Sequence, residues 1–372
     1  MAVLTVNGVT YTVTENISLM SFLRDTLRLT SVKNGCNEGA CGTCTVLIDG
    51  KAVKACVQKT DKLDGKSILT AEGLSDKERA IYVYAFSKAG AVQCGFCIPG
   101  MVICAKALLD RNPNPTRDAV KSAIKNNLCR CTGYKKIEEA ILLAAEMFRN
   151  GAVPEKPVDT GILGESTVRV DAEAKITGTA MYADDYYMEN MLYGSALRSE
   201  YPRAEILSID TSEAEKINGV ACVMTAKDIP GAQKVGHLKR DWDVLIPVGK
   251  TTHYLGDAIA LIAAETPEIL ETAKKAVKVQ YKPLQAVFSP EEAMAENAPS
   301  VHEDGNLLAY EHLVRGNADD IISKSKHKVT YHYSVPFTEH AFMEPECAVA
   351  FPEDDGIHII SGDQGIYQTQ RE

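Results

Sequence analysis

The sequence predicts a multidomain α+β protein, and the main evidence is a change of hydrophobic periodicity along its 372 residues. Short apolar runs of strand type, separated by turn signals, occupy residues 1–74, whereas residues 75–150 follow a helical period. Strands and helices alternate over residues 167–290, and strand-like runs return over residues 300–372. Residues 151–166 are rich in glycine and proline and therefore predict a linker.

The first segment is expected to form a β-grasp domain. Asn7-Gly8 and Asp49-Gly50 are strong signals for two-residue hairpins, because the favoured turn needs positive φ at both positions. Ser18 is a suitable N-cap for a short helix that continues to Leu27. The strands joined by the two turns are expected at residues 3–6, 9–13, 45–48 and 52–57. Hairpin, helix, cysteine-rich loop and hairpin follow one another in the β-grasp order.

The second segment is expected to be a four-helix bundle. Ser75 and Thr116 are N-cap candidates, and Pro99 fits the first turn of a helix, where its missing N–H costs nothing. The helices are expected at residues 76–89, 99–109, 117–126 and 135–149. Two of the short turns that connect them carry cysteines. Helices of this length with short connections predict antiparallel neighbours in a compact bundle.

The second half of the chain predicts a different architecture. A strand, a helix and a strand, expected at residues 258–264, 267–277 and 277–281, predict an α+β domain over residues 167–290. Later strands are expected at residues 329–335, 347–351 and 357–361. About 70 residues with unpaired strands make a poor domain alone. Residues 300–372 are therefore expected to begin a larger domain, and the chain to be the front part of a longer protein.

Charge and composition argue against several classes of protein. The net charge of -10 disfavours binding to nucleic acid and to an anionic membrane surface. The sequence contains neither an apolar run of membrane-spanning length nor a secretory signal at the N-terminus. Eleven cysteines without such a signal suit metal ligation in a reducing compartment, so a cytoplasmic protein is expected.

Four cysteines near the N-terminus have the spacing C-x4-C-x2-C-x11-C; they are Cys36, Cys41, Cys44 and Cys56. The first three follow the plant-type ferredoxin spacing, and four thiolates are what one 2Fe–2S cluster needs. The loop contains Gly35, Gly39 and Gly42, and positive φ there would let backbone N–H groups turn toward sulfur. A structural zinc site is the alternative, although zinc sites usually consist of paired C-x2-C motifs.

A second group of four reads C-x2-C and, well further along the chain, C-x-C; it comprises Cys94, Cys97, Cys129 and Cys131. Its spacing alone also suits zinc. Cys97 is expected at a helix start, where the helix dipole stabilises negative charge, and this favours a second 2Fe–2S cluster. Cys104, Cys222 and Cys347 lie in apolar runs and are expected to be buried core thiols.

Several blocks of the sequence resemble a known family. Gln93-Cys94-Gly95-Phe96-Cys97-Ile98-Pro99-Gly100-Met101 and Asn127-Leu128-Cys129-Arg130-Cys131-Thr132-Gly133-Tyr134 resemble the helical iron–sulfur domain of the molybdenum hydroxylases, which include xanthine dehydrogenase and aldehyde oxidoreductase. The first cysteine loop is similar to the ferredoxin domain of that family. Residues 168–185 resemble the opening of its α/β hammerhead domain, and residues 339–346 and 362–370 the start of its molybdopterin-binding domain.

The resemblance implies a molybdenum-dependent oxidoreductase with two 2Fe–2S clusters and a molybdopterin cofactor. Gln364 matches the glutamine that faces the molybdenum oxo ligand, and Gln93 and Cys131 match contacts to the pterin. The family's general-base glutamate has no counterpart in this chain. The implied reaction is oxidative hydroxylation of a purine such as xanthine, with electrons leaving through both clusters. Two alternatives stay open: aldehyde oxidation to a carboxylate, and an iron–sulfur electron-transfer subunit without its own catalytic site.

The resemblance also implies partners. The iron–sulfur segments are followed by a short linker instead of a flavin domain, so FAD is not expected on this chain. Electrons are expected to pass to an external acceptor or a separate flavin subunit, and a homodimer is compatible with the family. Residues 234–249 look most similar to selenium-dependent xanthine dehydrogenases. Glu344 and Glu346 are expected to hold a turn and not to act as paired acid and base, and the eight histidines show no metal-binding spacing.

Overall fold

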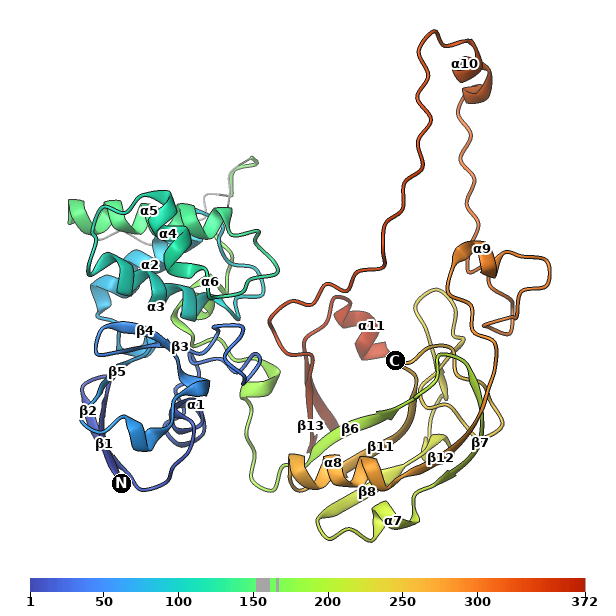
Figure 1. Ribbon diagram of the computed structural model, residues 1–372, viewed down its shortest axis with the longest axis horizontal. Coiled ribbons are helices and arrows are strands. Elements are labelled where there is room, and N and C mark those ends of the chain that lie inside the picture. Colours follow the sequence, from blue (N-terminus) through green and yellow to red (C-terminus); the bar gives the residue numbers. More distant parts are fainter. Residues whose placement is uncertain (152–160, 165–166, 372) are drawn as a thin grey trace. The chain divides into compact units, whose positions relative to one another are not determined.

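The computed structural model describes residues 1–151, 161–164 and 167–371. The chain divides into two compact units (Figure 1). The first unit contains Met1–Tyr186 and Val335–Gly362, and the second contains Tyr187–Ser334 and Asp363–Glu372. Most of the expected linker, residues 152–160 and 165–166, lies outside the described residues.

A five-stranded sheet at the start of the first unit has the order β2-β1-β5-β3-β4. Its strands are β1 (Ala2–Val6), β2 (Val9–Val13), β3 (Thr45–Ile48), β4 (Lys51–Lys54) and β5 (Ser67–Leu69). Strand β5 pairs parallel with β1 and antiparallel with β3, and so joins the two hairpins into one sheet. Asn7 and Gly8 have φ of 49° and 85°, and Asp49 and Gly50 have 48° and 76°, so both predicted hairpin turns are confirmed.

The helix after the first hairpin begins as expected but winds differently. The Ser18 side chain accepts a hydrogen bond from Ser21 N at the start of α1 (Leu19–Ser21). The chain then widens into the π-helix η1 (Phe22–Thr26), in which Leu27 N donates to Phe22 O. Arg24, in this wide turn, is buried and donates to Val32 O. The second hairpin also ends early: Ala55 N donates to Cys44 O, and residues 55–57 form the 3-10 helix η2 (Ala55–Val57) instead of strand.

The predicted four-helix bundle is present. Its helices are α2 (Asp76–Lys88), α3 (Ile98–Leu109), α4 (Arg117–Ile124) and α5 (Lys135–Asn150). Ser75 forms a capping box with Glu78, and the Thr116 side chain accepts from Ala119 N. Buried side chains from all four helices form one core. Helix α6 (Ala172–Thr177) packs on α2 and α3, within the first unit.

Shorter elements complete the first unit. They are the 3-10 helices η3 (Thr60–Lys62), η4 (Ala71–Gly73) and η5 (Ala183–Asp185), and the hairpin of β13 (Ala348–Glu353) and β14 (Gly356–Ser361). Strand β13 contacts η5. A hairpin from near the end of the chain therefore packs against a segment from its first half.

The second unit is built on a three-stranded antiparallel sheet of order β6-β11-β8. These strands are β6 (Tyr193–Arg198), β11 (Ala258–Ala264) and β8 (Val220–Met224). Helix α8 (Pro267–Ala276) packs on β11 and buries Leu270 and Ala273 against Ala260 and Ile262. The other elements are β7 (Ala204–Asp210), α7 (Ser212–Glu215), η6 (Ala226–Asp228), β9 (Lys234–Val235), β10 (Trp242–Asp243), β12 (Lys278–Pro283), α9 (Pro290–Ala293), α10 (Ala318–Lys324) and α11 (Ile366–Arg371).

Two further expectations are wrong. Residues 329–335 run without strand pairing, and Val329 and Val335 are exposed, because they have no strand partner among the described residues. Cys222 is exposed and Cys347 half-buried, so only Cys104 of the three remaining cysteines is a buried thiol. Cys222 lies on β8, an edge strand of a small sheet, where burial is incomplete.

Candidate functional site

The first cysteine group lies in the loop that leads into β3 and in η2. Cys41 N donates to Cys36 Sγ at 3.3 Å, and Cys41 Sγ lies 3.3 Å from Thr43 Oγ1. The hydrogen bond from Ala55 N to Cys44 O places Cys56 beside Cys44, and the two thiols interact through a hydrogen bond. The four cysteines therefore gather as two adjacent pairs.

Two glycines of this loop are required by close packing. A Cβ on Gly35 would lie 2.9 Å from Thr43 Oγ1 and 3.0 Å from Cys41 Sγ. Gly42 has a φ of +76°, and a Cβ there would lie 2.3 Å from Asn126 O. The predicted positive φ is confirmed at Gly42, whereas Gly35 serves to let the loop approach the sulfur.

The protonation of the first group reflects the loop backbone. Burial opposes ionisation of the Cys36 thiol, but hydrogen bonds from the N–H groups of Cys41, Glu38 and Ala40 prevail and lower its pKa to about 7. Burial raises the pKa of Cys44 to about 12, with Cys56 as a further cause. N–H groups that point at sulfur stabilise a thiolate, which is the form that binds iron.

The second cysteine group comes from two turns of the helical bundle. Cys94 and Cys97 precede α3, with Cys97 at its N-cap as predicted, and Cys129 and Cys131 lie between α4 and α5. Cys97 is hydrogen-bonded to Cys129, and Cys94 to Cys131. Each of these two contacts joins one cysteine of the first turn to one cysteine of the second.

Neighbouring thiols in this group differ in pKa. The hydrogen bond to Cys129, followed by burial, raises the pKa of Cys97 well above its usual range. The same hydrogen bond, with help from Thr132, lowers the pKa of Cys129 to about 5. Burial, followed by the charge of Cys94, raises the pKa of Cys131 to about 11. Cys97 with Cys129, and Cys94 with Cys131, therefore lie within hydrogen-bonding distance of each other.

The arrangement in pairs fits an iron–sulfur cluster better than zinc. A structural zinc site needs four ligands around one ion, whereas a 2Fe–2S cluster distributes four thiolates over two irons. Cys36 with Cys41, Cys44 with Cys56, Cys94 with Cys131 and Cys97 with Cys129 each suit one iron.

Residues that sequence reasoning missed hold these loops in place. Cys129 N donates to Tyr134 Oη at 2.9 Å, and Tyr134 has a φ of 68°. Thr132 Oγ1 lies 3.2 Å from Cys129 Sγ. Tyr182, from the segment expected to open the hammerhead domain, donates to Cys94 O at 2.8 Å. All three residues lie in blocks that carry the family resemblance, Thr132 and Tyr134 in residues 127–134 and Tyr182 in residues 168–185, but the resemblance assigns none of them a role.

The backbones of the two cysteine regions touch directly. Leu128 N donates to Cys41 O at 2.8 Å, so a residue next to Cys129 binds a residue of the first group. The buried Asn127 donates to Gly42 O at 2.9 Å, and its Oδ1 accepts from Cys104 Sγ at 3.2 Å. Cys104, expected as an ordinary core thiol, thus helps to orient Asn127.

The expected pterin contacts are placed in part. Gln93 is exposed, and its Nε2 donates to Cys131 O at 2.8 Å, so the structure brings these two residues together. Gln364 belongs to the second unit and lies exposed just before α11. Glu344 is half-buried, which raises the pKa of its carboxyl, and Glu346 is exposed.

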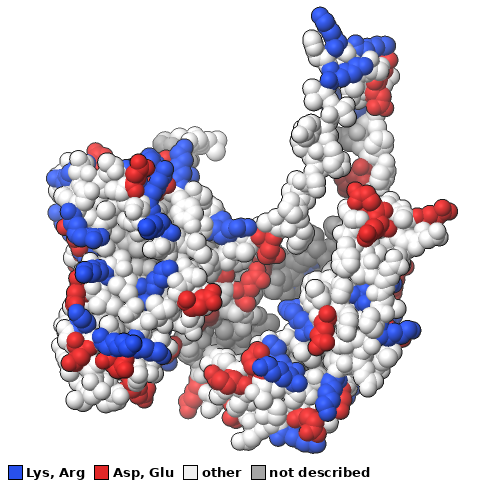
Figure 2. All heavy atoms as spheres, viewed as in Figure 1, with Lys and Arg blue, Asp and Glu red and all other residues white. Residues whose placement is uncertain are grey.

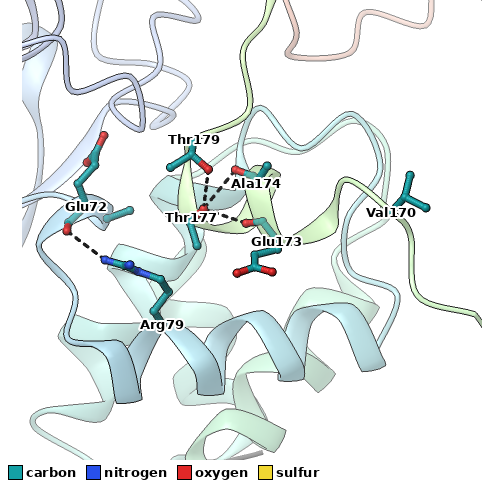
Figure 3. A pocket seen from close by; sticks show the side chains of 8 residues that line it. Glu72, Arg79, Val170, Glu173, Ala174, Thr177 and Thr179 are labelled. Atoms are coloured by element: carbon teal, nitrogen blue, oxygen red, sulfur yellow. Dashed lines mark hydrogen bonds between the residues drawn. The ribbon is translucent and has the colours of Figure 1, made fainter. Parts of the chain in front are cut away.

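A cavity of about 480 Å³ in the first unit lies apart from these residues, between η4, α2 and α6 (Figure 3). Its polar groups are largely engaged with one another: Thr177 Oγ1 donates to Glu173 O, and Arg79 to Glu72 O. The Glu72 carboxylate accepts from Ser31. None of the eight lining residues is a cysteine of either group, so we assign the cavity no catalytic role.

The surface shows mixed charge. On the face seen in Figure 2, Lys and Arg side chains alternate with Asp and Glu. Within the described residues, no helix has both the length and the apolar character needed to cross a membrane.

Comparison with family models gives the segments names. Residues 8–84 match a 2Fe-2S iron-sulfur cluster binding domain, and residues 70–142 a 2Fe-2S binding domain. Residues 177–285 match the a/b hammerhead domain of aldehyde oxidase and xanthine dehydrogenase. Residues 301–372 match a molybdopterin cofactor-binding domain. The expected order of segments is thereby confirmed.

Individual proteins that are similar to this chain belong to the same family as the matched domain models. The aldehyde oxidoreductase of Megalodesulfovibrio gigas is 36% identical over 98% of this chain and 43% of its own length. A probable xanthine dehydrogenase subunit of Bacillus subtilis is 44% identical over 55% of this chain and 27% of its own length. The solved aldehyde oxidoreductase from Desulfovibrio gigas superposes with a TM-score of 0.84 at 33% identity, over 96% of this chain and 42% of that one.

The chain spans less than half the length of each of these three proteins. Two 2Fe–2S domains, a hammerhead domain and the start of a molybdopterin-binding domain, in this order and with paired cysteines in both iron–sulfur domains, show that the chain belongs to the molybdenum hydroxylase family.

Proposed function

We propose that the full-length protein is a molybdenum-dependent hydroxylase that oxidises a purine such as xanthine and exports the electrons through two 2Fe–2S clusters. The observation that carries this proposal is the direct contact between two paired four-cysteine groups, ahead of a segment that matches a molybdopterin-binding domain. When bound, the molybdenum cofactor accepts two electrons from the substrate, and each cluster carries one at a time.

The eight cysteines are proposed as the cluster ligands. Cys36, Cys41, Cys44 and Cys56 would hold the first cluster, and Cys94, Cys97, Cys129 and Cys131 the second. Backbone N–H groups directed at Cys36 and the Thr132 hydroxyl beside Cys129 stabilise thiolates before metal arrives. Such hydrogen bonds to sulfur also adjust the reduction potential of a bound cluster.

The second cluster is proposed to lie on the molybdopterin side. Gln93 would donate to the pterin while its position is fixed by the hydrogen bond to Cys131 O, and Cys131 would be both a ligand and an acceptor for the pterin. Gln364 is proposed to face the molybdenum. The first cluster would then receive electrons through the contact between Leu128 and Cys41 and pass them to the acceptor.

The substrate class rests on two kinds of similarity. Purine oxidation is supported by the xanthine dehydrogenase subunit, which is 44% identical over 55% of this chain, against 36% over 98% for the aldehyde oxidoreductase. It is also supported by the resemblance of residues 234–249 to selenium-dependent xanthine dehydrogenases. Aldehyde oxidation is the second candidate, because the aldehyde oxidoreductase aligns with nearly the whole chain, from the ferredoxin-like domain into the molybdopterin domain.

The proposal extends to partners and boundaries. A relative named as a subunit supports a separate flavin or acceptor subunit, and we retain a homodimer and a cytoplasmic location as proposals. We also propose the domains as residues 1–74, 75–150, 167–290 and 300 onward, with residues 151–166 as linker.

Turnover of xanthine and benzaldehyde by the full-length holoenzyme, with a dye acceptor, tests the substrate. Xanthine oxidation supports the purine assignment, and benzaldehyde oxidation alone replaces it with the second candidate. A full-length protein that holds about four irons but no molybdenum, and oxidises neither compound, would instead be an electron-transfer subunit.

A further inference from the structure

Four charged residues of the first unit, Arg24, Lys33, Asp184 and Asp185, form a buried network beside the cysteine groups. Lys33 Nζ lies 2.6 Å from Asp185 Oδ2, and Arg24 lies 2.8 Å from Asp185 Oδ1. The side chains of Lys33, Asp185 and Arg24 are 1%, 0% and 5% exposed. Lysine and aspartate are almost never buried so fully unless they are paired, as they are here, and a buried ion pair is only weak evidence of stability. The network therefore invites a role beyond holding the fold together.

Lys33 connects to the first cysteine group through its backbone. Its carbonyl oxygen accepts from Thr43 Oγ1 at 3.0 Å, and the same hydroxyl lies 3.3 Å from Cys41 Sγ. Only one side chain thus separates this lysine from a proposed ligand of the first cluster.

The ammonium end of Lys33 points to the second group. Its Nζ lies 4.5 Å from the centre of the Tyr182 ring and 5.8 Å from that of Phe96. Tyr182 binds Cys94 O, and Phe96 stands between Cys94 and Cys97 in the chain. The rings of Tyr182 and Phe96 therefore lie between the Lys33 ammonium and the turn that carries Cys94 and Cys97.

The two carboxylates of the network, Asp184 and Asp185, contribute unequally to neutralising the Lys33 charge. Asp185 accepts from both Arg24 and Lys33, whereas Asp184 lies 4.0 Å from Arg24 and its Oδ1 is without a hydrogen-bond partner within the described residues. Burial, followed by the charge of Asp185, raises the pKa of Asp184. Lys33 therefore shares its nearest carboxylate with a second cation, in a region of low dielectric where its charge is weakly screened.

We propose that Lys33, held by Asp185, is an electrostatic tuning residue that raises the reduction potentials of the clusters, and that of the second cluster most. This inference rests on the proposed function only in requiring that both clusters are present. Reduction adds one electron to a cluster, and a buried positive charge nearby stabilises the reduced form. A raised potential at the second cluster favours the entry of electrons there.

The test is an EPR-monitored redox titration of both clusters in the full-length holoprotein at pH 6, which favours the protonated lysine. Lys33→Met removes one positive charge and should lower the reduced-to-oxidised ratio of the second cluster about tenfold at a fixed potential, which is 59 mV for one electron. Asp185→Asn removes one negative charge and should raise that ratio by a similar factor. The double variant should return close to the unmodified protein.

The matched control is Lys66→Met. Lys66 pairs with Asp49 at 2.8 Å, but the two side chains are 46% and 45% exposed, so solvent screens the pair. This variant should leave both potentials unchanged, and a shift equal to that of Lys33→Met would overturn the proposal.

A purely structural role predicts a different pattern. Both single variants would then move the potential in the same direction, or leave it unchanged while the protein loses stability, and either result contradicts the proposal. If Lys33→Met fails to retain the second cluster, Asp185→Asn decides alone: a raised potential supports tuning, and an unchanged or lowered one refutes it. Absence of two cluster signals in the unmodified holoprotein would instead refute the proposed function.

Discussion

At the scale of single residues, the cysteines and the groups that support them differ in how far they can be predicted. The spacing of the eight cysteines predicts both groups, because ligands of one centre recur at short, fixed intervals. Thr43, Thr132 and Tyr134 carry no such signal. Tyr134 has a φ of 68°, which a bulky residue seldom adopts. The hydrogen bond that its hydroxyl accepts from Cys129 N therefore depends on the conformation of the folded turn.

Replacement of one cysteine should remove one centre only. We expect Cys41→Ser to abolish the EPR signal of the first cluster and to leave that of the second, because the two groups share no thiol. Iron analysis of the holoprotein should show a loss of about half the iron. Loss of both signals from a protein that keeps its fold would contradict two separate sites.

Removal of the clusters should expose thiols that differ in reactivity toward an alkylating reagent. The pKa of Cys129, lowered to about 5, leaves it as thiolate at pH 6.5, whereas the raised pKa of its partner Cys97 keeps that thiol protonated. Iodoacetamide should therefore modify Cys129 well before Cys97 in chelator-treated protein, as mass spectrometry can follow. The advantage of Cys129 should disappear as the pH falls below about 5.

The control in the same experiment is Cys104. It is buried, and burial raises its pKa to about 12, so it should stay unmodified throughout. Modification of Cys104 at the rate of Cys129 would indicate that chelation unfolds the bundle and not that the two thiols differ.

At the scale of elements, local sequence signals predict where a helix begins better than they predict its type or where a strand ends. Ser18, Ser75 and Thr116 cap helices as expected, since a cap depends on a few adjacent residues. The sequence pattern predicts neither the π-helix after Ser21 nor the early end of β4, where Ala55 N donates to Cys44 O across the hairpin. Residues 329–335 have strand composition without a strand partner among the described residues, and composition cannot supply one.

The close contact of the first cysteine loop with the bundle should be sensitive to one methyl group. Gly42→Ala would place a Cβ 2.3 Å from Asn126 O at a φ of +76°. We expect a destabilisation of about 3 kcal/mol or more, from strain and overpacking together. Thermal unfolding of the holoprotein measures it, and the magnetic coupling of the two clusters should change as their loops move apart.

Gly50→Ala separates the two causes. Gly50 has the same φ of +76°, but nothing lies within 4 Å of its ideal Cβ. This variant should cost only the conformational strain, roughly 1 to 2 kcal/mol, and leave the magnetic coupling as it was. Equal effects of the two variants would mean that the contact at Gly42 relaxes freely.

At the scale of the whole molecule, the order of the four segments followed from motifs, but the division of the chain into units did not. Residues 168–186 resemble the hammerhead opening, yet they pack within the first unit, where Tyr182 and Asp185 reach the cysteine turn and Lys33. Hydrophobic periodicity reports local structure and contains no information on which unit a segment joins.

The relay order can be tested in the full-length enzyme. Cys129→Ser should remove the second cluster and with it electron exit from the molybdenum centre, so that substrate no longer reduces the first cluster in stopped-flow absorption. The first cluster should still be reduced by dithionite, which shows that it is intact. Normal turnover with the natural acceptor would contradict the proposed order.

The return of Val335–Gly362 to the first unit has a consequence for biosynthesis. The ribosome must synthesise all of Tyr187–Ser334 after Tyr186 before the hairpin of β13 and β14 exists. At about 5–20 residues per second this delay is roughly 7 to 30 s. During that interval both cysteine groups have been synthesised, while the hairpin that packs against η5 is still missing. The nascent chain therefore contains both cysteine groups before the first unit can be completed.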